Sequence, residues 1–333
     1  MKYIRTNGTS IYPACQGFSL IELMVAMAIG LFLITGVLVV YVNGHRSQAA
    51  VDKQVEMVDN ARFALETISA DLRQAGVYGR VNFANVADSA ALGVPKVTPG
   101  ALAGVVFPGQ CAAGWVIDWT APVRVLNANT YGGACMVNYW QGDILEARYT
   151  LQTPVLAATL VANPNQIFVN TTVKNAQFFR GNNSPNPPAV LPAPSNGFTD
   201  HAYVLNAYYI ARNSDNAADG IPSLRQVSLR PDGTVVDQVL LSGVENMRIQ
   251  IGMGTDSNAD GQSDTFIYRN PATVTTLIGA DTVQIWLVVR STEGVTGIDT
   301  SRNNVSFAGG TINFPNDGIR RNVVSTVVSL RNI

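Results

Sequence analysis

Residues 17–37 read GFSLIELMVAMAIGLFLITGV, and the apolar run continues to Val42 with a single carboxylate, Glu22. At 1.5 Å per residue, a helix over residues 18–42 is about 37 Å long, which is enough to cross a bilayer with some tilt. A carboxylate at membrane depth costs roughly 2.5–3.5 kcal/mol on insertion scales. The sequence therefore predicts a membrane helix in which Glu22 needs a partner.

Three ordinary explanations of this run fit poorly. It is longer than the apolar core of a cleaved secretory signal, about 7–15 residues, although Ser47-Gln48-Ala49 has the small-x-small pattern of a cleavage site. Cys15 precedes the run, whereas a lipoprotein cysteine follows it. A plain anchor fits the length but leaves Glu22 unexplained. Lys2 and Arg5, with no acidic residue nearby, predict that the segment before the run stays in the cytoplasm.

The order of glycine, phenylalanine, a short polar step, glutamate and an unbroken apolar run resembles the class III signal of type IV prepilins and pseudopilins. The resemblance implies that a peptidase cuts between Gly17 and Phe18, that residues 1–17 are the leader, and that the new amino terminus is methylated. The freed amine of Phe18 is a cation at the depth of Glu22, so the carboxylate of one subunit can pair with the amine of a neighbour. The alternative for Glu22 alone is a snorkelling carboxylate near the membrane interface.

Apolar residues continue beyond the membrane run at helical spacing. They are Val51, Val55, Val58, Ala61, Leu65, Ile68, Leu72 and Ala75. No proline occurs between Pro13 and Pro95, and Gly76 provides a natural stop. We expect one helix over residues 18–76, with residues 18–42 in the membrane and the second half lying on a globular domain. An anchor helix followed by a separate helix is the alternative.

The region 77–333 is predicted to be β-rich, which gives an α+β fold. The clearest strands are 203–212, 224–230, 238–253, 281–291 and 322–330, and the weaker ones lie in 77–86, 143–151 and 166–170. Residues 181–197 hold five prolines and should form an irregular loop. We interpret that loop as an insertion in one domain, with a boundary between two β lobes as the alternative.

The end of the chain narrows the resemblance. YYIARNSDNAADGIPSLRQVSL (208–229), VENMRIQIGM (244–253) and RRNVVSTVVSLRN (320–332) are similar, in order and spacing, to the PilW family of minor pilins. The resemblance implies a type IV pilin-like fold, with a long amino-terminal helix packed on a β-rich carboxyl-terminal domain. Major pilins often carry a proline in the membrane part of the helix, whereas this chain has Val39 at the matching place, which favours a minor component.

Two cysteines follow the apolar run, Cys111 and Cys135. An even pair outside the cytoplasm predicts one disulfide, worth roughly 3 kcal/mol in the chain-entropy model. The alternative is two buried free thiols.

The composition argues against an enzyme and against a nucleic-acid-binding protein. Net charge is −1, so no basic field exists to hold nucleic acid. The only histidines are His45, just after the membrane run, and His201, beside Asp200. No nucleophile elbow, zinc-helix motif, phosphate loop or C-x-x-C occurs. We therefore predict no catalytic residues.

One string suggests a metal. In DSNADGQSD (256–264), oxygen-bearing side chains recur at alternate positions around Gly261, as in calcium loops. The candidate ligands are Asp256, Asn258, Asp260, Gln262 and Asp264. Ile267 stands where an EF-hand has its bidentate glutamate, so affinity for Ca²⁺ should be weak. The alternative is an Asx-rich hairpin turn. We interpret NSDNAADG (213–220), with poorer spacing, as a turn.

Taken together, these patterns predict a minor pilin of type IV pilus assembly, made at the bacterial inner membrane with its β-rich domain in the periplasm and then built into the pilus. Its expected partners are a prepilin peptidase and methylase and other minor and major pilins. No cofactor is predicted except the candidate Ca²⁺. A J-like minor pseudopilin of type II secretion is the nearest alternative, and a membrane-anchored enzyme or sugar-binding protein is a more distant one.

Overall fold

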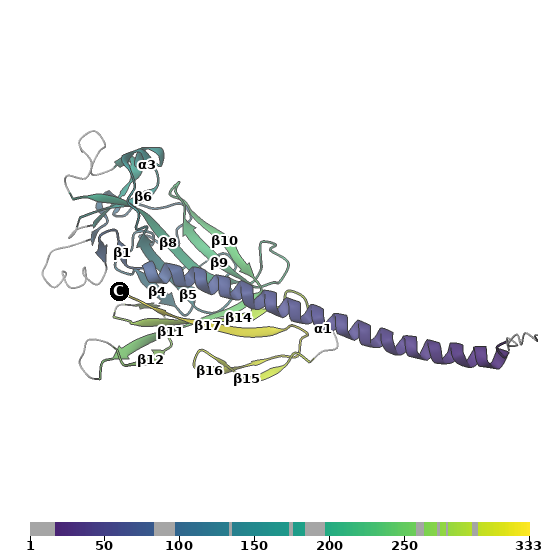
Figure 1. The fold of residues 1–333 in the computed structure, drawn as a ribbon. Coiled ribbons are helices and arrows are strands. Elements are labelled where there is room, and N and C mark those ends of the chain that lie inside the picture. The colour runs from purple at the N-terminus through teal and green to yellow at the C-terminus, as the bar shows by residue number, and fades with distance from the viewer. Residues whose placement is uncertain are drawn as a thin grey trace, which may run out of the picture. The chain divides into compact units, whose positions relative to one another are not determined.

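A computed structural model describes residues 17–82, 97–132, 135–172, 176–183, 197–257, 263–271, 274–277, 279–294 and 299–333. The chain divides into two compact units, Met1–Lys53 and Gln54–Ile333. One helix, α1 (Leu20–Gln74), runs from the first unit into the second, and the strands all belong to the second (Figure 1).

Helix α1 is continuous, as the sequence predicts, and the conformation of Gly76 ends it. Gly76 has a φ of 83°, the left-handed conformation that glycine adopts readily after a helix. Its N–H donates to the carbonyl of Arg148 at 3.0 Å, so the chain leaves the helix directly onto a strand. Short strands β1 (Val77–Tyr78) and β2 (Val81–Asn82) then pair with each other.

A nine-stranded sheet forms the larger layer of the second unit. Its strands are β3 (Val97–Thr98), β4 (Val123–Leu126), β5 (Ile144–Thr150), β6 (Ile167–Thr171), β7 (Ala176–Arg180), β8 (Thr199–Ala211), β9 (Ser223–Leu229), β10 (Val235–Ser242) and β13 (Val274–Thr276). The long strand β8 pairs with β5 on one side and with β6 and then β9 on the other. Two short helices, η1 (Gly100–Leu102) and η2 (Gly181–Asn183), and helix α3 (Ala157–Ala162) lie in its connections.

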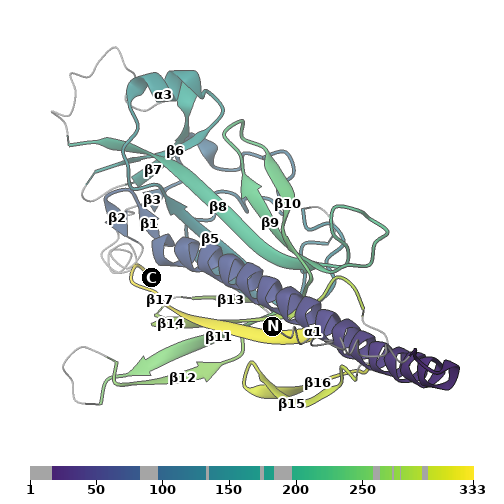
Figure 2. The same cartoon turned by 45° about the vertical axis from the view of Figure 1, so that its right-hand side comes forward.

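A four-stranded antiparallel sheet forms the second layer. Its order is β12 (Thr265–Arg269), β11 (Val244–Thr255), β14 (Thr282–Arg290) and β17 (Arg321–Ser329). Side chains alternate between its faces, as the period of a strand requires. A separate hairpin, β15 (Arg302–Phe307) and β16 (Gly310–Phe314), lies near this sheet (Figure 2). The rings of Phe307 in the hairpin and Trp286 in β14 are 6.5 Å apart.

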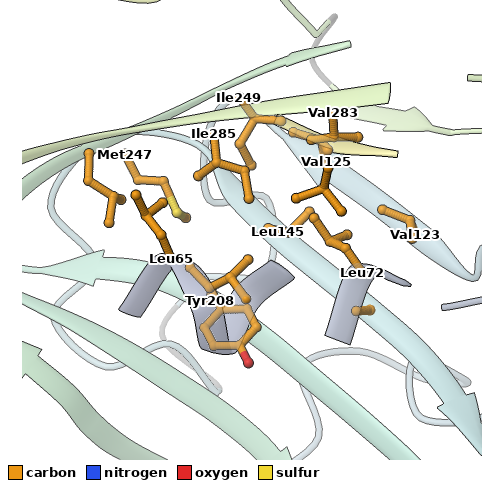
Figure 3. Close-up of a cluster of buried hydrophobic side chains, with 14 of the residues drawn as sticks. Leu65, Leu72, Val123, Val125, Leu145, Tyr208, Met247, Ile249, Val283 and Ile285 are labelled. Atoms are coloured by element: carbon orange, nitrogen blue, oxygen red, sulfur yellow. The ribbon is translucent and has the colours of Figure 1, made fainter. Parts of the chain in front are cut away.

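The main core lies where the second half of α1 meets both sheets (Figure 3). Leu65 and Leu72 of the helix lie among Val123, Leu145 and other side chains of the large sheet. The four-stranded sheet supplies Met247, Ile249, Val283 and Ile285 from the other side. Small buried residues on the same helix face, Ala61, Ala64 and Ala75, let the sheets approach the helix closely.

The opposite face of the large sheet is covered by irregular chain. Buried residues from the connection 99–122, among them Phe107, Trp115 and Val116, pack on side chains of β8 such as Leu205 and Tyr209. A second hydrophobic core forms here, and within the described residues the connection 99–122 that covers it contains only the short helix η1.

The α+β prediction is confirmed, and most predicted strands are present. The prediction of one strand over 238–253 is wrong, because Gly243, with a φ of 82°, separates β10 from β11 and sends them into different sheets. The five-proline loop interrupts a single sheet, since β6 before it pairs with β8 after it, which agrees with an insertion. Residues 83–86 of the first weak candidate and 184–196 of the loop lie outside the described residues.

Candidate processing, anchoring and assembly sites

The amino-terminal part of the described chain is an open segment followed by a helix. Gly17, Phe18 and Ser19 precede the first helical residue, Leu20, and the ring-bearing side chain of Phe18 is 87 % exposed. A Cβ built on Gly17 would meet nothing within 4 Å. A peptide bond in such an exposed, uncrowded segment is accessible to a protease.

Glu22 lies in the first turn of α1, three residues after Ser19. Its Oε2 accepts the backbone N–H of Ser19 at 3.3 Å, which is the return half of a capping box. A carboxylate in the first turn also interacts favourably with the positive end of the helix dipole. Glu22 is thus held at the helix start with its second oxygen available for a further donor.

The first half of α1 exposes its apolar side chains all around. Those between Phe18 and Val42 are exposed in this single chain, as Leu31 and Phe32 illustrate. Among the described residues, α1 is the one helix long and apolar enough to cross a membrane, judged by length and composition. An all-round apolar helix needs lipid or neighbouring helices to cover it.

The second half of α1 is held to the large sheet by a buried carboxylate that the sequence analysis overlooked. Asp71 accepts the hydroxyls of Tyr149 and Tyr208 at 2.7 and 2.6 Å and the amide of Asn206 at 2.7 Å. Burial, followed by the negative charge of Asp71, raises the pKa of both tyrosines well above the ordinary value, so they remain donors at all physiological pH. An acid on the apolar face, between Ile68 and Leu72, was the available signal.

The two cysteines form the predicted disulfide, Cys111–Cys135, with their Cα atoms 4.8 Å apart. It joins the connection 99–122 to the connection 127–143, and both half-cystines are buried in the second core. The alternative of two free thiols is therefore excluded.

A buried ion pair lies under the covering connection 99–122. Arg148 Nη2 donates to Glu146 Oε2 at 2.8 Å, and both side chains are fully buried on β5. Arg148 also donates to the carbonyls of Trp115 and Ala121 at 3.0 Å, and Trp115 Nε1 donates back to Glu146 at 2.9 Å. Burial opposes the charge of Arg148, but Glu146 keeps the pKa of the guanidinium above its usual value. These bonds attach the covering chain to the sheet.

The candidate calcium string falls largely outside the described residues, which include only Asp256 and Asp264 among its proposed ligands. The two ends are close, since the N–H of Ser257 donates to Asp264 Oδ2 at 2.9 Å. The string connects β11 to β12 as a hairpin, which is the setting of the Asx-turn alternative. No cluster of three or more His, Cys, Asp or Glu that could hold a metal occurs in the part of the chain the structure describes.

The other residues singled out in the sequence, His201, Asp200 and the segment 213–220, make hydrogen bonds within the fold. His201 is buried, with Nδ1 2.8 Å from the carbonyl of Leu151 and Nε2 3.0 Å from the hydroxyl of Thr199. Asp200 binds the amide of Asn170 at 2.6 Å. In 213–220, Asp219 accepts N–H groups from Ser214 and Ile221, which confirms a turn.

Two family models match parts of the chain, one near each end. Residues 207–332 match the model described as Type IV Pilus-assembly protein W, and residues 13–38 match the Prokaryotic N-terminal methylation motif. Residues 207–332 are called the PilW region below, after the model that they match. The PilW region begins within β8 and contains the whole four-stranded sheet.

One solved structure with similarity is the type IV-like pilin TTHA1219 from Thermus thermophilus. It is 10 % identical, with a TM-score of 0.39 over 83 % of this chain and 95 % of that chain. No curated protein sequence matches the chain.

Proposed function

We propose that this chain is a minor pilin that takes part in type IV pilus assembly. The observation that carries the proposal is the combination of a prepilin signal at Gly17–Glu22, an apolar helix exposed on all sides, and a PilW region at the other end. Such a helix is suited to lipid before assembly and to a bundle of similar helices afterwards. The prepilin signal implies a prepilin peptidase and other pilins as partners.

In this proposal the chain has three parts: the leader 1–17, the helix 18–76 with residues 18–42 in the inner membrane, and the β-rich domain 77–333 in the periplasm. Cleavage after Gly17 and methylation of Phe18 leave a cationic amine near Glu22. The carboxylate already accepts one N–H from its own helix start, and its free oxygen can accept the amine of a neighbouring pilin. The pair fixes the register between subunits and offsets the cost of both charges in an apolar bundle. The β-rich domain contacts partner pilins and primes the filament, and the chain has no catalytic role.

The proposal is tested by Glu22→Ala, with Glu56→Ala on the exposed side of the same helix as the control. Mass spectrometry of the mature amino terminus should show a methylated Phe18 in wild type. Sheared pili should contain wild type and Glu56→Ala but lack Glu22→Ala, which should remain in the membrane. Equal incorporation of all three chains would contradict the proposed role of Glu22. Surface pili at normal numbers in a deletion strain that has lost secretion would instead support the pseudopilin alternative.

Calcium binding at Asp256, Asn258, Asp260, Gln262 and Asp264 stays a prediction. Titration of the chain with Ca²⁺ up to the millimolar range, typical of extracellular sites, should detect it. Unchanged binding in Asp260→Ala, or no binding at all, would retire the site.

A further inference from the structure

The four-stranded sheet of the PilW region has two unpaired edges. Within the residues the structure describes, β12 pairs with β11 alone and β17 with β14 alone (Figures 1 and 2). An edge strand presents a row of N–H and C=O groups that can pair with another chain. Proteins usually protect such edges with charges, prolines or bulges.

Strand β12 has little of this protection. Thr265–Tyr268 contains no charge and no proline, and Arg269 stands only at its end. Phe266 and Ile267 point to opposite faces and are 41 % and 54 % exposed. Met253, opposite Ile267 on β11, is exposed as well. This edge is apolar on both faces.

Strand β17 is similarly unprotected beyond its first residue, Arg321. Asn322–Ser329 contains neither charge nor proline. The N–H of Leu330 donates to the carbonyl of Asp281, just before β14. The backbone N–H and C=O groups of the even-numbered residues of β17 therefore point to β14, and those of the odd-numbered residues point outward from the edge.

The beginning of that outward row is already occupied. The carbonyl of Arg321 accepts Arg302 Nη1 at 3.2 Å, and the N–H of Val323 donates to Asn322 Oδ1 at 3.0 Å. The open stretch is therefore Ser325–Ser329, five residues long, the same length as β12.

The directions of the two edges decide how copies can meet. Each strand of this sheet is antiparallel to its neighbour, and the strands number four, so β12 and β17 run in opposite directions. A second copy displaced sideways, with its helix parallel to the first, presents β17 antiparallel to β12. Antiparallel pairing of β12 with β12 of another copy needs a twofold axis perpendicular to the sheet, which reverses the strands and the helix packed on them.

We propose that the edge of β12 binds the Ser325–Ser329 edge of a second copy of this chain, extending the four-stranded sheet from subunit to subunit. The proposal rests on the proposed function for one point, that neighbouring copies share one orientation because the same helix anchors them. The interface is heterologous, so each copy keeps one free edge for the next subunit. Main-chain hydrogen bonds supply the attraction, and side chains on the shared faces select the register.

The face on which each side chain lies predicts which residues of β12 in one copy meet which residues of β17 in the next. Phe266 lies opposite Gly254, and Val327 lies opposite Gln284 and, through it, Gln250. Gly254 and Gln250 are four residues apart on β11, so Phe266 and Val327 lie on the same face. Thr326, opposite Ile285, lies on the other face.

Disulfide cross-linking in membranes tests the proposal with the full chain in a Cys15→Ser background. One chain carries Phe266→Cys, and a differently tagged chain carries Val327→Cys, with Ser325→Cys and Ser329→Cys as the neighbouring registers on the same face. We expect a linked pair for one of these three and a much weaker band for Thr326→Cys, which points to the other face.

The matched control separates the edge from general surface effects. Ile267→Lys on the Phe266→Cys chain should abolish the link, whereas Val106→Lys, an exposed apolar residue outside the sheet, should leave it unchanged. Absence of a link at all three positions, a link that survives Ile267→Lys, or Phe266→Cys chains linking chiefly to each other would overturn the proposal. These results are independent of pilus incorporation, so minor pilin function can stand when the edge pairing fails.

Discussion

Asp71 offers the sharpest test of how the helix is attached to the β-rich domain. The residue is 7 % exposed, and its carboxylate accepts three donors, from Tyr149, Asn206 and Tyr208. A hydrogen bond to a charged group contributes about 1.5–3 kcal/mol net, and the three are not additive because they share one acceptor. Removing the acceptor also leaves buried donors without partners. We therefore expect Asp71→Ala to lower the free energy of unfolding by about 3–5 kcal/mol.

The measurement is equilibrium unfolding of the full chain in detergent, followed by tryptophan fluorescence. All four tryptophans, Trp115, Trp119, Trp140 and Trp286, lie in the second unit, so the signal reports the β-rich domain. Asp59→Ala is the matched control on the same helix, because Asp59 is exposed and its ion pair with Arg62, at 3.6 Å, lies on the surface. It should change the free energy of unfolding by less than about 0.5 kcal/mol.

Tyr208→Phe should lower the free energy of unfolding by about 1 kcal/mol, since it deletes one donor while Tyr149 and Asn206 keep Asp71 as their acceptor. In the double variant Asp71→Ala/Tyr208→Phe the two losses should not add, because the same hydrogen bond is removed twice. A cost for Asp71→Ala below about 1 kcal/mol, comparable to Asp59→Ala, would refute the view that this carboxylate fastens the helix. Full additivity in the double variant would refute the hydrogen bond between Asp71 and Tyr208.

Three further predictions concern the buried and surface ion pairs and the disulfide. Cys135→Ser should destabilise the domain by about 3 kcal/mol in denaturant unfolding, and a reducing agent should weaken wild type but not the variant. Arg148→Met should cost about 3–5 kcal/mol because it removes the guanidinium 2.8 Å from the fully buried Glu146 and leaves Arg124, at 3.6 Å, as the nearest described cation. Glu146→Gln in the same chain should restore part of the loss. The Arg321 guanidinium lowers the pKa of Asp317 to about 2, so its stabilisation is complete above the ordinary pKa and is lost as pH falls toward 2. Asp317→Asn should therefore unfold with a smaller dependence on pH between about 4 and 2 than wild type.

The sequence predicted the helix and the strands β14 and β17 well because these elements carry strong periodic signals. The helix has apolar residues at steps of three and four, and β14 alternates cleanly between faces. The break at Gly243 was missed because residues on either side, Leu241 and Val244, are both strand formers, and only the left-handed φ of the glycine separates them. Local pattern cannot show that two neighbouring strands belong to different sheets.

The irregular cover of the large sheet could not be predicted for a different reason. Its residues, such as Phe107 and Trp115, are spaced by glycines and turns and show no period of two or 3.6. Their positions depend on contacts distant in sequence, including the disulfide and the bonds to Glu146 and Arg148. At the amino terminus the reverse holds, because the residues proposed for cleavage and assembly are neighbours in the chain and form one contiguous motif.

Arg148 shows why the two faces of the large sheet should respond together. Its carbonyl accepts the N–H of Gly76 at the end of α1, and its own N–H donates to the carbonyl of Pro122 at 2.8 Å. Its side chain crosses to the other face and binds Trp115 and Ala121 of the cover. A displacement of the cover therefore acts on the same residue that receives the end of the helix. The last turn of the helix is thus held by Asp71 and by β5, and the position of β5 depends on the disulfide-bonded cover. Loss of the cover should therefore loosen the helix end, although the cover and the helix lie on opposite faces of the sheet.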